Sequence, residues 1–402
     1  MNVAKVLVVG VNAVGMIGVL RSLGRAGYET FAIAEKEDAL GLYSTYAKHV
    51  SCCPFMDSSE FLPWLREYLK EKNIEVIIPN EEFLHAISED YHEFSHFLPD
   101  AVSIDVWQRC LSKVATQQTI TENLPEASWH LPIAGIVRDK ASMPVELELA
   151  ACAGPFYVKA DAGLSRGAKD AHVIRCESVA EMVELIEHLL PGYDAILWQH
   201  YVPGRKVGVS LWRHNGEIVA QNMTLGIHMQ PWEGGMMSLR ESFWHEQLLI
   251  DAIEKMETLG WQGVAMMEYK WDPATDEFWF IEINARYWGY LHLDLFSGKD
   301  FPKLQTDAFF GEIKKDLERP STHVVCRHTV PGEIGYMLSK LRSNDVSICR
   351  KMITIFGFFL RFFNFRIKSD LFFEGDRLLY LRSWRNFIKN YKLILILKLQ
   401  IV

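Results

Sequence analysis

Several features that define specialised protein classes are missing from this 402-residue sequence. Its seven cysteines are an odd number without a Cys-x-x-Cys pair, which argues against a disulfide framework and predicts a reducing, cytoplasmic location. There is no low-complexity linker, and 49% hydrophobic against 23% charged residues excludes global disorder. A net charge of -9 argues against a dedicated nucleic-acid-binding protein.

Long uncharged stretches are also missing. Met352–Leu360, the longest in the C-terminal region, is far shorter than the ~20 residues that a membrane-spanning helix needs, so we expect no transmembrane segment. The stretch Val6–Leu20 superficially resembles a secretory signal, but Asn12 and several glycines interrupt it. No small-x-small cleavage site follows, so a strand, a turn and a helix fit this stretch better.

Negative charge is scarce at the end of the chain. Residues 340–402 hold 13 Lys/Arg, 4 Asp/Glu and 12 aromatic residues, a net of +9, whereas residues 1–339 carry -18. The chain is thus an acidic body with a basic, aromatic C-terminal extension, which we expect to be helical. Two interpretations remain open for this extension. It could pack on the acidic body, for example at a homodimer interface, or it could contact anionic lipid peripherally at the inner face of a membrane.

Short apolar runs alternate with helical patterns over roughly the first 110 residues. Lys5–Val9 and Val76–Ile78 are typical of buried strands, and Gly15–Ala26 and Glu81–Phe94 of helices. This alternation predicts a doubly wound parallel sheet. The glycines after the first strand lack the Gly-x-Gly-x-x-Gly spacing, so a tight strand–helix turn is favoured over a dinucleotide-binding site.

The most informative segment is a predicted hairpin between residues 264 and 284. If Trp271 faces Trp279 across its turn, Glu268 falls opposite Glu282. Facing like charges destabilise a pair of strands, so two carboxylates in an otherwise apolar hairpin need a partner. A hard divalent cation would resolve this conflict.

Two neighbours of Glu282 extend the candidate site. Asn284 shares the face of Glu282, and carboxylate and amide oxygens suit Mg²⁺ that is bound together with phosphates. Arg286 lies on the same side and could hold a carboxylate or a transferring phosphoryl group. An ordinary solvated hairpin face is the alternative.

Two further segments carry candidate binding groups. Lys159 ends an apolar strand, and the loop Asp161–Gly167 that follows could offer backbone N–H groups to phosphates. The apolar strand with Gln199 stops at Pro203-Gly204, a break that could expose polar groups to an adenine. Taken alone, each segment is more often an ordinary strand end.

Together and in order, these segments resemble the ATP-grasp superfamily, specifically its carboxylate–amine or carboxylate–thiol ligases, over about residues 3–335. Glu282–Gly289 (EINARYWG) and Asp300–Pro302 (DFP) are similar to the metal strand and the following motif of a branch of carboxylate–amine ligases. Two N-terminal segments match as well: Ser44–Lys48 before Pro54, and Ile77–Glu81.

The resemblance implies roles for individual residues. The nucleotide would contact residues of four segments: Lys113, Lys159, Gly163, Ser165, Arg166, Gly167, Gln199, His200 and Val202. One or two Mg²⁺ ions, for which Mn²⁺ could substitute, would be held by Glu268, Glu282 and Asn284. The catalytic residues would be Arg286, which stabilises the transferred phosphoryl group or acyl-phosphate, and Lys159. Candidates for the substrate carboxylate or amine are His228, Arg240 and Tyr287.

The resemblance also implies an architecture and an activity. The fold would be α/β, with α+β grasp domains, in four parts: a Rossmann-like pre-ATP-grasp domain (1–112), a lid (113–203), a subdomain with the Mg–ATP site (204–339) and the extension (340–402). The enzyme would be an ADP-forming ligase that couples a small-molecule or glycan carboxylate to an amine. A phosphotransferase acting on a hydroxyl and a non-catalytic ATP-binding regulatory or scaffold protein remain open.

The sequence departs from the family pattern in four places. Ala160 and Ala285 replace prolines, and Tyr290 stands where a small residue is common, which could reshape the acceptor pocket. Arg205-Lys206 stands where an acidic residue usually follows the Pro-Gly, which puts the usual contact there in doubt. Because the metal ligands and both lysines are intact, we expect an active enzyme.

Overall fold

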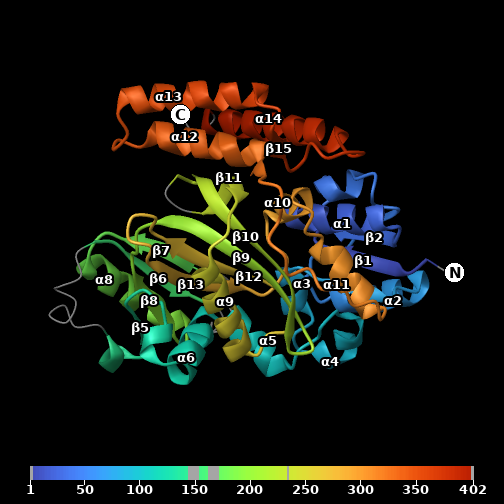
Figure 1. The fold of residues 1–402 in the computed structure, drawn as a ribbon, viewed down its shortest axis with the longest axis horizontal. Helices are drawn as coiled ribbons and strands as arrows, with labels where there is room; N and C mark the ends of the chain where they lie inside the picture. Colours follow the sequence, from blue (N-terminus) through green and yellow to red (C-terminus); the bar gives the residue numbers. More distant parts are fainter. Residues whose placement is uncertain (1–2, 144–153, 162–171, 233–234, 400–402) are drawn as a thin grey trace. The chain divides into compact units, whose positions relative to one another are not determined.

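The computed structural model describes residues 3–143, 154–161, 172–232 and 235–399 (Figure 1). They belong to two compact units, each assembled from separate segments of the chain. Unit 1 comprises Met1–Ala101, Glu217–Trp244 and Arg286–Val402, and unit 2 comprises Val102–Gly216 and His245–Ala285. Four predicted phosphate-loop residues lie outside the described part of the chain: Gly163, Ser165, Arg166 and Gly167.

Unit 1 contains a four-stranded parallel sheet in the order β3-β2-β1-β4. Its strands are β1 (Lys5–Val9), β2 (Glu29–Ala34), β3 (His49–Cys52) and β4 (Val76–Ile78). The helices of this region are α1 (Val14–Ala26), α2 (Phe61–Lys72), α3 (Glu81–Ala86) and α4 (Tyr91–Phe94). Val6 to Val9 are fully buried, as expected for a parallel sheet that is covered on both faces. The predicted doubly wound sheet is confirmed.

One predicted helix of this region is wrong. The sequence pattern favours a single helix over Glu81–Phe94, but the structure ends α3 at Ala86 and begins α4 only at Tyr91. Ser88 and Asp90 lie in the interruption, and both residue types favour turns and caps over helix interiors. The apolar spacing continues through the break, which is why periodicity alone did not reveal it.

The glycines after β1 are explained by close packing. A Cβ at Gly10 would lie 2.1 Å from Asn80 Nδ2, and Asn80 in turn caps α3 by accepting a hydrogen bond from Phe83 N (3.1 Å). A Cβ at Gly15 would lie 2.4 Å from Trp288 O. These contacts confirm the predicted tight strand–helix turn.

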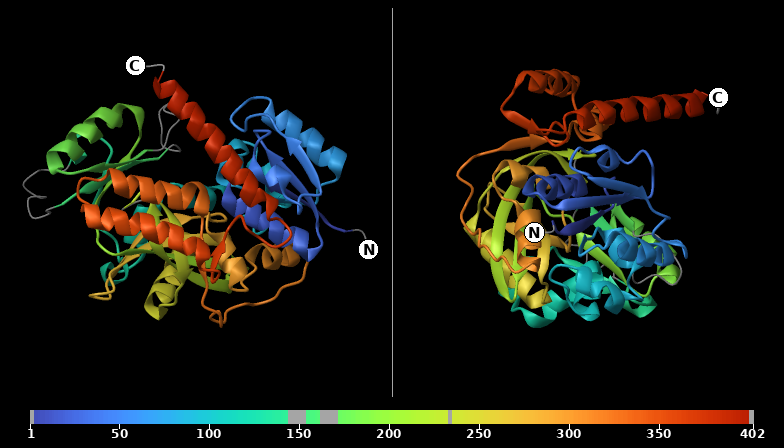
Figure 2. Two further views of the ribbon diagram at one scale, coloured as in Figure 1. Left: turned by 90° about the horizontal axis from the view of Figure 1, so that it is seen from above. Right: turned by 90° about the vertical axis from the view of Figure 1, so that its right-hand side faces the viewer.

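The remaining strands of unit 1 form a second region of sheet. β11 pairs antiparallel with β10 and with β14, and β15 adds to β14 in parallel. The strands are β10 (Glu217–Gln230), β11 (Met236–Ser242), β14 (Val325–Arg327) and β15 (Ile367–Ser369). The helices are α10 (Leu291–Phe296), α11 (Phe301–Phe309), α12 (Ile334–Arg342), α13 (Ile348–Leu360) and α14 (Leu378–Leu399). Figure 2 shows that α12 and α13 lie side by side and that α14 runs at an angle to them.

The C-terminal extension is tied to the rest of unit 1 by buried ion pairs. Asp376 accepts a hydrogen bond from Arg21 Nε (2.8 Å), and Asp370 pairs with Arg240. His292 Nε2 lies 2.8 Å from Arg21 Nη1, and burial together with this guanidinium lowers the pKa of His292 to about 3. The extension is mainly helical, as predicted, and part of it packs on the body.

Asp294 of α10 gives unit 1 a measurable pH dependence. It accepts hydrogen bonds from Trp288 Nε1 (2.6 Å) and Asn222 Nδ2, and burial raises its pKa to about 7. Its pKa in the unfolded chain is about 3.9, so the native state binds an extra proton between about pH 4 and pH 7. The contribution of Asp294 to stability therefore falls as the pH rises through this window.

The Asp294→Asn variant tests this contribution. We expect its free energy of unfolding, relative to wild type, to rise by up to about 1.4 kcal/mol per pH unit between about pH 4 and pH 7. Denaturant titrations across this range measure the difference, with Asp105→Asn at an exposed position as the control. Parallel pH curves for wild type and Asp294→Asn would contradict the assignment.

Unit 2 contains two groups of antiparallel strands. One has the order β5-β8-β6-β7, and in the other β12 pairs with β9 and β13. The strands are β5 (Ala134–Val137), β6 (Phe156–Ala160), β7 (His172–Cys176), β8 (Ile196–His200), β9 (Arg205–His214), β12 (Gly263–Trp271) and β13 (Phe278–Asn284). The helices are α5 (Ile104–Leu111), α6 (Lys113–Asn123), α8 (Val179–Leu189) and α9 (Glu246–Leu259). Across the described residues of both units, no helix is both long and apolar enough to cross a bilayer.

Candidate functional site

The hairpin of β12 and β13 brings two carboxylates together. Glu268 pairs directly with Glu282, as predicted. The assumed turn register is wrong, however, because Trp271 pairs with Phe278 and not with Trp279. A bulge between Glu268 and Tyr269 shifts the register by one residue and restores the Glu268–Glu282 pairing.

Asn284 completes the oxygen donors of this hairpin. Its Nδ2 donates a hydrogen bond to Glu282 Oε1 (3.3 Å), which places the amide beside the carboxylate. Two carboxylates and an amide oxygen form a donor set that Mg²⁺ accepts in proteins. No group of three or more His, Cys, Asp and Glu residues forms a metal centre in the described residues, so a metal here would depend on this smaller set and on ligands from a substrate.

Three lysines surround the carboxylate pair. Lys206 Nζ lies 2.6 Å from Glu268 Oε1, and Lys113 Nζ lies 3.8 Å from Glu282 Oε2. The side chain of Lys159 is only 5% exposed and interacts electrostatically with both glutamates. The Asp161 carboxylate also acts electrostatically on Lys159, so three lysines stand against three carboxylates in this part of unit 2.

The protonation equilibria reflect this crowding. Burial lowers the pKa of Lys159, and the positive charge of Lys113 lowers it further. Burial also raises the pKa of Glu268, against the opposing effect of Lys206. Burial alone would raise the pKa of Glu282 as well, but the positive charges around it outweigh burial and lower the pKa.

The turn between α5 and α6 fixes the position of Lys113. Ser112 is the N-cap of α6 and accepts a hydrogen bond from Ala115 N (3.1 Å), so Lys113 is the first residue of the helix. Asp161, just after β6, accepts from Ser112 Oγ (2.9 Å) and Val114 N (3.2 Å). This carboxylate ties the end of the Lys159 strand to the start of the Lys113 helix.

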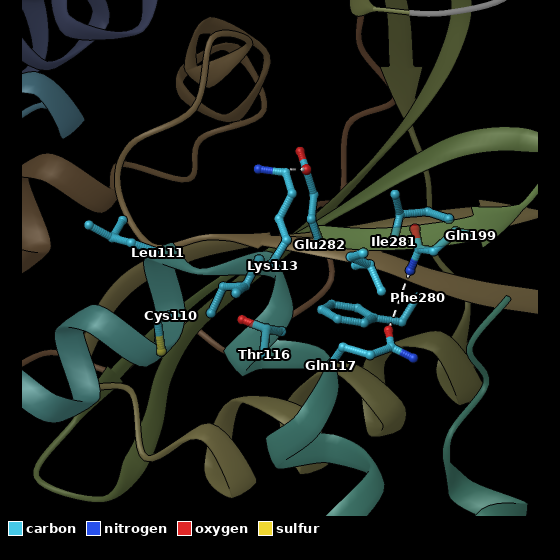
Figure 3. A pocket seen from close by; sticks show the side chains of 11 residues that line it. Cys110, Leu111, Lys113, Thr116, Gln117, Gln199, Phe280, Ile281 and Glu282 are labelled. Carbon is cyan, nitrogen blue, oxygen red and sulfur yellow. Dashed lines mark hydrogen bonds and ion pairs between the residues drawn. The ribbon is translucent and has the colours of Figure 1, made fainter. Parts of the chain in front are cut away.

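A pocket opens beside the cluster, within unit 2 (Figure 3). The space that the centre of a water molecule can occupy is only about 20 Å³, and the volume is about 320 Å³ when the solvent at its mouth is included. Figure 3 shows Lys113 and Glu282 pointing toward each other on one side of it, and Gln199 Nε2 donating to Gln117 Oε1 (3.4 Å) on another. Apolar side chains complete the lining: Leu111, Leu197, Phe280, Ile281 and Ile283. Cys110 and Thr116 line it as well, so polar and apolar groups share the wall.

Two predicted adenine contacts, His200 and Val202, follow the pocket residue Gln199 closely in the sequence. His200 ends β8, and its backbone N–H donates to Ile133 O (2.7 Å), so this N–H already has a partner and the nucleotide contact of His200 stays a prediction. Val202 follows β8 and stays a prediction. Gln199, by contrast, lines the pocket directly.

Arg286 belongs to unit 1, where its Nε donates to Glu81 Oε2 (2.6 Å). Nη1 of the same guanidinium donates to Tyr287 O (3.1 Å). Glu81 is exposed enough for this pair to exchange, since its side chain is 43% accessible. The catalytic role of Arg286 stays a prediction.

The three substrate candidates also lie in unit 1, and each has an internal partner. His228 Nδ1 lies 3.0 Å from Glu333 Oε1, and its ring stacks on Tyr336. Arg240 is almost completely buried and pairs with Asp370. Tyr287 donates to Gln305 Oε1 (2.7 Å). All three have a structural function here, and their substrate contacts stay predictions.

The sequence reasoning missed several residues of the site. Gln117 and Phe280 line the pocket, Asp161 joins two binding segments, and Lys206 pairs with a metal candidate. Lys206 was noticed only as a departure from the family pattern. The spacing of Ser112 before an apolar helix was a usable N-cap signal, but nothing local marked Asp161 as its partner.

Comparisons with known proteins identify the fold. No protein-family profile and no curated protein matches the sequence. Many solved structures resemble it, and three of them have TM-scores of 0.58 to 0.62. L-amino acid ligase from Bacillus licheniformis has 13% identity and a TM-score of 0.58, with 78% of this chain and 76% of that chain covered.

The other two structures cover similar shares of the chain. Biotin carboxylase from Campylobacter jejuni has 16% identity and a TM-score of 0.62, with 81% of this chain and 75% of that one covered. N5-carboxyaminoimidazole synthetase from Staphylococcus aureus, complexed with ADP, has 13% identity and a TM-score of 0.59, with 80% and 81% covered. The chain therefore has the ATP-grasp fold, as the motifs suggested.

Proposed function

We propose that this protein is an ATP- and Mg²⁺-dependent ligase that activates a carboxylate as an acyl-phosphate and couples it to an amine. The observation that carries the proposal is the cluster of Lys113, Lys159 and Lys206 around the pair Glu268–Glu282, at the side of a small pocket. Such a cluster can hold a polyphosphate and a divalent cation together, and the base of the nucleotide would lie toward the pocket.

Each group of the cluster has a task in this proposal. Glu268, Glu282 and Asn284 would hold the metal, which supplies charge neutralisation to the phosphates when bound. Lys113 and Lys159 would bind phosphate oxygens as point charges. Gln199 would accept a hydrogen bond from the adenine amino group. The predicted loop contacts of Gly163, Ser165, Arg166 and Gly167 belong to the same proposal.

The chemistry follows from these positions. A carboxylate oxygen of the substrate attacks the γ-phosphorus, the bond to the β-phosphate oxygen breaks, and ADP leaves. The amine then attacks the acyl carbon and loses a proton, and phosphate departs with a former carboxylate oxygen. The residues of the site position the groups and offset the charge that moves during phosphoryl transfer.

A screen for acid-dependent turnover tests this function. The purified protein with Mg²⁺ and ATP is mixed with small-molecule and sugar carboxylic acids, and hydroxylamine serves as a general amine. We expect ADP release that depends on the acid, together with a hydroxamate product. Acid-independent ADP release, or a stable phosphorylated hydroxyl compound, would contradict the ligase proposal.

One observation favours a second candidate, a nucleotide-binding protein without turnover. Lys206 occupies Glu268 through an ion pair of 2.6 Å, and a cation bound there competes with a metal ion. In such a protein the lysines would hold the nucleotide without a complete metal site. Nucleotide binding without acceptor-dependent ADP release distinguishes this candidate from the ligase.

The variant Lys206→Met measures the competition. With the ammonium gone, Glu268 is free to bind a metal, so we expect the affinity for Mn²⁺ in the absence of nucleotide to rise about tenfold. Electron paramagnetic resonance of free Mn²⁺ gives this affinity. Lys270→Met is the matched control, because its ammonium donates to Gly204 O and lies on the same strand as Glu268. An unchanged or weaker Mn²⁺ affinity in Lys206→Met would show that Lys206 does not compete.

A further inference from the structure

The helix α13 has apolar side chains on two opposite faces. One face packs inside unit 1, where Phe358 and Phe362 join a cluster with Val330, Ile334 and Trp384. The other face carries large apolar residues spaced three or four positions apart along the helix and just beyond it: Ile348, Met352, Phe356, Phe359 and Phe363. This spacing aligns them in a single stripe, which we call the α13 outer face.

The α13 outer face is strongly exposed. Phe356 is 67% exposed and Phe363 is 75% exposed, and Phe365 beyond them is 89% exposed. Ile353 and Leu360 widen the stripe and are also exposed. Figure 1 shows α13 on the side of α12 that faces away from strand β11. Large apolar side chains that are exposed in a row along one helix face are typical of a binding surface.

The segment that carries this face is basic from Val346 to Ser369, after the exposed Asp345. Between Val346 and Ser369 there is no Asp or Glu, while five basic residues occur: Arg350, Lys351, Arg361, Arg366 and Lys368. Arg361 turns inward, with Nη2 at 3.3 Å from His228 Nε2. The other four form no ion pair with any residue that the structure describes. Helical spacing turns Arg350 and Lys351 away from the α13 outer face, whereas the exposed Arg366 and Lys368 follow the helix.

We propose that the α13 outer face, together with the basic residues Arg366 and Lys368 that follow the helix, binds the surface of an anionic phospholipid bilayer. Aromatic and aliphatic side chains would enter the boundary of the acyl chains, while the basic side chains would reach lipid headgroups. Juxtaposed Lys and Arg residues strengthen such binding through the negative surface potential. The arrangement attaches the protein to a membrane without a spanning helix.

A second copy of the chain fits this face less well. A two-fold dimer presents the same patch from both subunits, so it would bring the acid-free basic segments of two copies together. Like charges that meet in an interface oppose association. An anionic bilayer offers both an apolar phase and the complementary charge. Binding to it would not depend on the proposed ligase chemistry.

Flotation with lipid vesicles tests the proposal on the full-length protein. We expect binding to phosphatidylcholine–phosphatidylglycerol vesicles that is much weaker with phosphatidylcholine alone and falls between about 0.1 M and about 1 M salt. The double variant Phe356→Ser/Phe363→Ser should lower the partition coefficient at least about tenfold. The double variant Arg366→Gln/Lys368→Gln should abolish most of the preference for anionic lipid.

Matched controls separate lipid binding from general effects. Ile250→Ser/Ile313→Ser changes two residues that are 57% and 53% exposed elsewhere, and it should bind vesicles like wild type. Equal binding by wild type and by both test variants would overturn the proposal. A dimer in light scattering that Phe356→Ser/Phe363→Ser dissociates, without vesicle binding, would assign the face to a second copy. If the protein neither dimerises nor binds vesicles, the face would belong to a protein partner. This result too would overturn the proposal.

Discussion

The rate of acid-dependent ADP formation is expected to fall at least about a hundredfold in the Glu282→Gln variant. Glu282 pairs with Glu268 across the hairpin, interacts with Lys113, and accepts a hydrogen bond from Asn284. The substitution keeps the size of the side chain and one acceptor oxygen for Asn284, but it removes the charge and the second oxygen that would hold the metal. ADP formation with the acid found by the screen measures the loss.

Two additional measurements make the Glu282→Gln result specific. Glu277→Gln, at an exposed position of the same hairpin, should keep wild-type turnover. Mn²⁺ affinity in Glu282→Gln should fall along with turnover, because the same oxygen atoms serve both. Turnover close to wild type in Glu282→Gln would remove this residue from the metal site.

The Lys159→Met variant is expected to weaken binding of a non-hydrolysable ATP analogue by about ten- to a hundredfold. Lys159 is buried at the end of β6, and burial lowers the pKa of its ammonium group. Methionine fills a similar volume without the charge, so the fold should persist while the attraction for phosphate oxygens is lost. Isothermal titration calorimetry in the presence of Mg²⁺ measures the affinity.

The control for Lys159→Met removes a lysine from the surface of the same unit. Lys140 is exposed and begins the short helix Lys140–Ser142. The Lys140→Met variant should bind the analogue like wild type. Equal affinity in Lys159→Met and wild type would exclude Lys159 from the phosphate site. A loss in Lys159→Met alone would support the lysine cluster as the phosphate-binding element.

The parts of the fold that sequence could predict depend on local patterns. Lys5–Val9 and Val76–Ile78 were predicted with the observed bounds because short apolar runs between turn residues have few alternatives. The break between α3 and α4 was missed because the apolar spacing continues through it. The bulge beside Glu268 was also invisible, since no residue type near it demands a bulge.

The candidate site was predictable where chemistry is concentrated in one hairpin. Glu268 and Glu282 face each other in the structure. This pairing could be predicted because the strand pattern and the conflict of like charges both indicate it. The ion pair of Lys206 with Glu268 and the ties of Asp161 to Ser112 are tertiary contacts between distant segments. Spacing along a single sequence carries no information on such contacts. The division into four sequence segments, cytoplasmic location and a homodimer stay predictions.

The fate of a carboxylate oxygen tests the central claim most directly. An acid that supports ADP release in the screen is prepared with a heavy oxygen isotope in its carboxylate, and the protein turns it over with ATP, Mg²⁺ and hydroxylamine. Mass spectrometry of the released phosphate then reads the bond that formed. The account predicts one labelled oxygen atom in each phosphate, because the acyl-phosphate carries it across. Phosphate without label, at a full yield of ADP, would contradict activation of the carboxylate.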